Sequence, residues 1–113
     1  MRSDEQVIRG IVSYIDNEVM PKMTTAGKWM VGAWTVLAAE KASSVIHVVL
    51  SHPAVTSIGV VDESGMIDID RIEKAFVESA ERCGTIYIDI PMIGRMSYSA
   101  ADIHNIASYI NRQ

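Results

Sequence analysis

The chain has 113 residues, of which 49% are hydrophobic and 21% are charged. This is the size and composition of one globular domain, residues 1–113, and it excludes a disordered chain. The net charge of −4 argues against nucleic acid as a partner, because a nucleic-acid-binding domain needs a basic face.

The net negative charge comes from one half of the chain. Residues 62–113 hold nine acidic and five basic residues, whereas residues 1–61 hold five of each. We interpret the acidic half as a solvated face, with a surface for a basic partner as the alternative.

The first predicted helix spans residues 4–19. Ser3 and Gln6 form a capping-box pattern at its start. Apolar residues then recur at the i, i+3, i+4, i+7 spacing of an amphipathic helix. Pro21 is expected to end or kink this helix.

Residues 27–51 predict one long helix that stops before Pro53. Apolar residues cover most of its circumference, so it should be buried on more than one side. At about 37 Å it is too long for so small a domain to surround, which favours a second copy of the chain as partner. Glu40, Lys41 and His47 interrupt the segment, so we expect no membrane span. The predicted interface comprises Trp29, Val31, Trp34, Ala38 and Ala42.

Residues 60–76, "VVDESGMIDIDRIEKAF", have the outline of a calcium-binding EF-hand loop. With Gly65 at its central glycine, the first ligand position holds Val60 and the twelfth holds Arg71. Calcium needs oxygen ligands at both positions, so we expect no calcium. A glycine turn, an extended segment and a helix start explain the same residues.

The helix that follows this loop has Asp70 as its predicted N-terminal cap, with Glu73 three residues later. Its apolar stripe runs to Cys83, and Gly84 stands where a C-terminal glycine cap belongs.

The hydrophobic period then changes from 3.6 to 2. "TIYIDI" and "RMSYS" alternate on either side of the turn "PMIG", which predicts a β-hairpin over residues 85–98. Residues 66–69 are a plausible third strand, because a lone hairpin is marginally stable. Ser99 with Asp102 caps a last helix. The fold class is therefore α+β: mainly helical, with a long central apolar helix and a small antiparallel sheet.

Few residues suggest chemistry. The single cysteine, Cys83, excludes an intramolecular disulfide and fits a reducing compartment. His47, His52 and His104 lack metal-ligand spacing, so we expect no metal and no cofactor. The N-terminal ten residues contain acids where a secretion signal has basic and then apolar residues, which favours a cytoplasmic location.

Two segments resemble small prophage-associated proteins of Gram-positive bacteria. These are "SHPAVTSIGVVDESGMIDIDRIEKAF" and "IDIPMIGRMSYSAADIHNIASYI". The resemblance covers residues 3–110 loosely and 57–110 better. It implies a bacterial or phage cytoplasmic setting, and it brings no catalytic residue with it.

The function expected from the sequence is that of a non-enzymatic assembly or interaction protein of phage type, acting as a homo-oligomer. The first alternative is a small DNA-associated or regulator-binding protein. The second is an enzyme with a histidine or carboxylate site, and a deep pocket holding His47 or the pair Asp68 and Asp89 would favour it.

Overall fold

Helices dominate the computed structural model, which describes residues 1–90 and 94–113. A two-stranded antiparallel sheet completes the described part, so the mainly helical α+β class is confirmed. The elements in chain order are α1 (Asp4–Tyr14), η1 (Ile15–Val19), η2 (Met20–Lys22), α2 (Thr25–Glu40), α3 (Ala42–Leu50), α4 (Pro53–Thr56), α5 (Ile69–Cys83), β1 (Ile86–Ile90), β2 (Gly94–Tyr98) and α6 (Ala100–Asn111).

The capping box predicted at the start of α1 is present. The Ser3 hydroxyl accepts from the Gln6 backbone N–H at 3.2 Å, and the Gln6 side chain accepts from the Ser3 N–H at 2.9 Å. The helical backbone continues as the π-helical turn η1 and the 3₁₀ turn η2. It ends at Lys22, one residue after Pro21, because the chain must then turn back toward α2.

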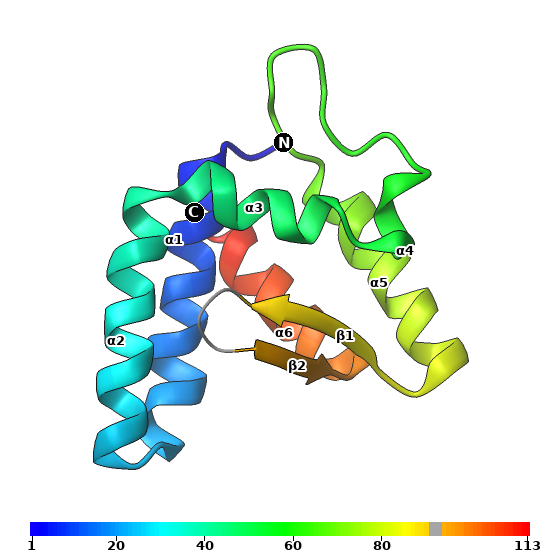
Figure 1. Cartoon of the computed structure of the whole chain (residues 1–113). Coiled ribbons are helices and arrows are strands. Elements are labelled where there is room, and N and C mark those ends of the chain that lie inside the picture. Colours follow the sequence, from blue (N-terminus) through cyan, green and yellow to red (C-terminus); the bar gives the residue numbers. More distant parts are fainter. Residues whose placement is uncertain (91–93) are drawn as a thin grey trace.

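The prediction of one long helix over residues 27–51 is wrong. Two helices, α2 and α3, replace it and meet at an angle of 97°. Lys41 between them has non-helical backbone angles, with φ −124° and ψ 45°. A straight helix would run past the rest of the domain, whereas the bend brings α3 across α1 and β1 and buries Ile46 (Figure 1).

Length and hydropathy of the helices decide whether the described residues could cross a membrane. No single helix there combines the length and the apolar character that a span requires. The bent pair α2 and α3 has the required length and apolar character only when both helices are counted together.

The hairpin predicted over residues 85–98 is confirmed as strands β1 and β2. Its register pairs Ile86 with Tyr98 and Ile90 with Gly94. Residues 91–93 of the predicted turn "PMIG" lie outside the described residues.

A third strand at residues 66–69 is not formed. Ile67 makes only isolated bridges, with Arg2 and Val61, and Ile69 already belongs to α5. Ile67 is 1% exposed, and its backbone exchanges two hydrogen bonds of 2.8 and 2.7 Å with Arg2. These two hydrogen bonds pair the backbone N–H and C=O groups of Ile67 without adding a strand to the sheet.

Helix α5 begins two residues earlier than predicted. Asp68, rather than Asp70, is the N-cap, and its side chain accepts from the Arg71 N–H at 3.1 Å. Ile69 is thereby turned into the core as the first helical residue. The predicted cap Gly84 ends α5 with φ 83°, a conformation that favours glycine.

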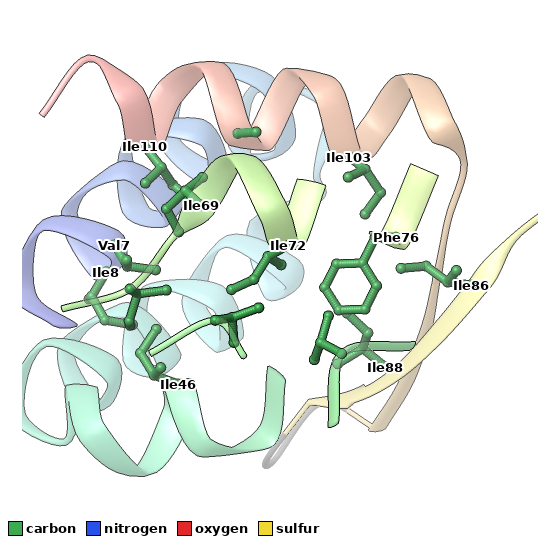
Figure 2. Close-up of a cluster of buried hydrophobic side chains, with 14 of the residues drawn as sticks. Val7, Ile8, Ile46, Ile69, Ile72, Phe76, Ile86, Ile88, Ile103 and Ile110 are labelled. Atoms are coloured by element: carbon green, nitrogen blue, oxygen red, sulfur yellow. The ribbon is translucent and has the colours of Figure 1, made fainter. Parts of the chain in front are cut away.

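The core forms where α6 packs between α1 and α5, with β1 and α3 closing the other side. Figure 2 shows isoleucine, valine and phenylalanine side chains converging from these elements. Gly10 of α1 is buried against α6, and a Cβ atom there would overlap the backbone of Ile110. The absence of a side chain at Gly10 therefore sets the spacing of α1 and α6.

We predict opposite effects for alanine at two helical glycines. Gly10→Ala should lower the free energy of unfolding by about 1–3 kcal/mol, because it forces α1 away from α6. Gly32→Ala in α2 is the matched control, since its Cβ would meet open space. It should raise the free energy of unfolding by up to about 1 kcal/mol through helix propensity. Urea unfolding followed by circular dichroism measures both, and equal stabilities would contradict the close-packing argument.

Candidate functional site

Helix α2 carries apolar side chains on two opposite faces. One face is buried and consists of Val31, Trp34 and Ala38. The other consists of Trp29, Met30, Ala33 and Val36, and we call it the outer face of α2. Trp29 is 78% exposed and Val36 is 61% exposed, so the outer face presents large apolar groups to solvent.

The spacing of these residues explains the two faces. Successive residues of an α-helix are turned by about 100°, so Trp29 and Val36, seven apart, lie on the same side. Trp34, five residues after Trp29, points to the opposite side and is 5% exposed. A helix that is apolar on two sides has one side left over when a single domain packs against the other.

The structure separates the five residues predicted for an interface. Trp29 lies on the outer face, whereas Val31, Trp34 and Ala38 are in the chain's own core. Ala42 is half-buried and packs against that core. They therefore do not form one surface.

Sequence reasoning missed three residues of the outer face, namely Met30, Ala33 and Val36. The available signal was the position of Ala33 and Val36, one turn and two turns from Trp29, whereas Met30 directly follows Trp29 and lies at the edge of this face. That signal gives a shared side, but it does not say which side of the helix faces solvent.

The three histidines serve different local structures. His52 caps α4: its Nδ1 accepts from the Ala54 N–H at 3.1 Å, so its Nε2–H donates to the Tyr87 carbonyl at 3.0 Å. His104 lies 2.7 Å from a Glu73 carboxylate oxygen. His47 is exposed, with Ser51 at 3.3 Å.

The carboxylates considered for catalysis also have separate partners. Asp68 caps α5, and Asp70 accepts from the Asn111 side chain at 3.4 Å. Asp89 pairs with Arg95 across the hairpin at 3.3 Å, with both side chains exposed. No group of three or more His, Cys, Asp or Glu residues within the described ranges is arranged to hold a metal ion.

The EF-hand-like outline is a hydrogen-bonded loop built on Asp62. One Asp62 carboxylate oxygen accepts from the Ser64 hydroxyl at 2.7 Å and from the Ser64 and Met66 N–H groups at 2.9 Å. Gly65 completes the turn with φ 86°. Arg71, at the position of the calcium-binding glutamate, donates to the Gly59 carbonyl at 2.7 Å.

An apolar cavity between the helices and the hairpin holds none of the residues considered for catalysis. It has a volume of about 360 Å³, and neither His47 nor Asp68 nor Asp89 is among its described lining residues. A second pocket, of about 450 Å³, is lined by Asp4, Ser43, Ser44, Ile46, His47 and Leu50. It holds His47 but neither Asp68 nor Asp89, and it is an open depression at the surface rather than the deep pocket that would favour an enzyme.

The Asp62 loop gives a pH prediction. Hydrogen bonds from the Ser64 hydroxyl and then the Met66 N–H lower the pKa of Asp62. A lowered pKa in the folded state means that the loop contacts are fully present above about pH 4 and are lost as the pH falls through that lower value. The amide shifts of Ser64 and Met66, followed by NMR, should report this transition. Asp62→Asn should abolish it while keeping one acceptor, and a midpoint at or above about 3.9 would contradict the assignment.

Comparison with known proteins returns no match: no family model, no curated protein and no solved structure matches this chain. The resemblance of residues 57–110 to prophage-associated proteins stays a prediction.

Proposed function

We propose that the chain is a non-enzymatic interaction protein that pairs with a second copy of itself through the outer face of α2. The observation that supports this most is Trp29, a tryptophan 78% exposed at the N-terminal end of the apolar outer face. Tryptophan is among the residues most enriched at the energetic centres of protein interfaces. A phage or prophage assembly in a bacterial cytoplasm is the setting we propose with it.

The hydrophobic effect supplies the driving force for this pairing. Trp29, Met30 and Val36 are each more than half exposed. Fully burying such a side chain stabilises by about 1.5–3 kcal/mol, and a symmetric pair covers each residue twice. Small Ala33 between them would let the two helices approach closely.

The charges of α2 favour an antiparallel arrangement. Lys28 is exposed near the N-terminal end of the helix and Glu40 is exposed at its C-terminal end. In a two-fold pair crossing near Ala33, the Lys28 end of one helix lies beside the Glu40 end of the other. Opposite charges then meet at both ends, whereas a parallel pair would bring like charges together.

The test is the solution mass of a charge variant. We expect the unmodified chain to have about twice the 12.4 kDa monomer mass by light scattering. Val36→Lys should give a folded monomer, because pairing would bury a lysine charge of each copy against apolar side chains of the other. Val61→Lys is the matched control, since Val61 is also an exposed valine, 46% exposed, but lies in the loop before α5. It should leave the mass unchanged.

Circular dichroism of each variant separates loss of pairing from loss of folding. Charges at the buried Val31 or Ala38 would not make this distinction, because both side chains are in the core. A monomeric unmodified chain, or a Val36→Lys variant that keeps the doubled mass, would refute the proposal.

A further inference from the structure

The central cavity lies on the inner side of α2, away from the outer face. Side chains of α1, α2, α3, α5, α6 and both strands line it. Figure 2 shows part of this lining, with Ile72 and Phe76 of α5 opposite Ile46 of α3 and Ile88 of β1. Several lining residues, such as Val45, Val48 and Ile106, are only partly buried although they belong to the core. The cavity is partly open to solvent, so close packing does not cover all of these side chains.

The size of the cavity is that of a small-molecule site. Its volume of about 360 Å³ lies in the range of ligand pockets. An engineered apolar cavity of about 150 Å³ holds one benzene molecule, so this cavity fits roughly 12–15 non-hydrogen atoms. The cavity is partly open to solvent and lined mainly by apolar side chains, and leaving such a lining in water is unfavourable, which favours an apolar occupant.

The charges at the cavity exclude an anion. Two carboxylates, those of Glu73 and Asp102, are among the described lining residues, and lysine, arginine and histidine are absent from that set. A carboxylate ligand would lose its hydration and meet like charge without a cation to pair with it.

Polar groups are concentrated on one part of the lining. Tyr14, Ser97, Tyr98 and Asp102 come from the end of α1, from β2 and from the start of α6. Burial raises the pKa of the Tyr98 hydroxyl, and the nearby Tyr14 and Asp102 raise it further. These hydroxyls therefore stay neutral and can both donate and accept a hydrogen bond.

Trp34 places a tryptophan side chain at the wall of the cavity. It lines the cavity and is 5% exposed, and its indole N–H is buried with no acceptor among the described residues.

We propose that this cavity is a binding site for a neutral, mainly aliphatic molecule of up to about 15 non-hydrogen atoms with a hydroxyl or similar uncharged polar head. The apolar body lies against α3, α5 and β1, and the head lies near Tyr14 and Tyr98. This site is independent of the proposed self-association, because it uses the opposite side of α2.

The two tryptophans make the test direct. Trp29→Phe leaves Trp34, at the cavity, as the only tryptophan of the chain. Titration with 1-decanol should change the Trp34 emission saturably and raise the melting temperature. Decanoate at pH 7, with the same chain length and a charged head, should bind at least about tenfold more weakly.

Two variants locate the ligand. Val45→Phe fills part of the cavity and should weaken 1-decanol binding at least about tenfold, whereas Val61→Phe outside it should have no effect. Tyr98→Phe removes only the hydroxyl and should weaken binding about fivefold. If Val45→Phe fails to fold, Tyr98→Phe and the comparison of the two ligands still decide.

The results separate this inference from the proposed self-association. Val36→Lys should bind 1-decanol as the unmodified chain does, whatever its mass. Absence of a saturable Trp34 response, equal affinity for decanoate and 1-decanol, or a folded Val45→Phe that binds normally would each overturn the proposal. A Trp34 response that follows the protein concentration instead of the decanol concentration would assign the cavity to a second copy of the chain.

Discussion

The close approach of α1 and α6 at Gly10 is the contact on which most of the described structure depends. Because Gly10 has no side chain, the backbone of Ile110 can lie directly against α1. Helix α6 is thereby held between α1 and α5, and both helices bury apolar residues on it. Strand β2 leads into α6 through the Ser99 cap, so the position of α6 also places the hairpin. A change in the α1–α6 spacing would move all of these elements together.

Helix α2 packs against these elements with only one of its two apolar faces. Its inner face packs into the domain through Val31, Trp34 and Ala38, while α3 turns away by 97° to cover the top of the core. The outer face then has no neighbour among the described residues, although it carries Trp29 and Val36. This apolar surface fits the proposed protein partner better than a catalytic site, because none of the four residues of the outer face is titratable.

The interior of the domain also contains apolar side chains that are not fully packed. Protein cores are normally packed to the density of organic crystals. Here the side chains of five helices and the hairpin surround a space of about 360 Å³, and Trp34 takes part in its lining. Trp34 and Trp29 therefore divide the two proposed roles of α2, because one faces the cavity and the other faces solvent. A ligand inside and a second chain outside would each complete a different side of the same helix.

The sequence by itself determined the features that depend on neighbours within about four residues. The capping boxes at Ser3 and Ser99, the glycine cap at Gly84 and the two strands of the hairpin were predicted and are present, although burial alternates only along β1. Each is a local hydrogen-bonding or torsional requirement that the residues themselves express. Much of the fold class was accessible for this reason.

Only the tertiary structure decided the rest. The bend at Lys41 has no proline or glycine to announce it, since it arises because α3 must reach β1 and bury Ile46. The choice of Asp68 over Asp70 as a cap depends on which isoleucine enters the core. Packing among elements far apart in the chain decides which tryptophan lies inside. The same packing leaves a cavity beside it. Periodicity shows that a helix has apolar sides, and long-range packing selects the one that is covered.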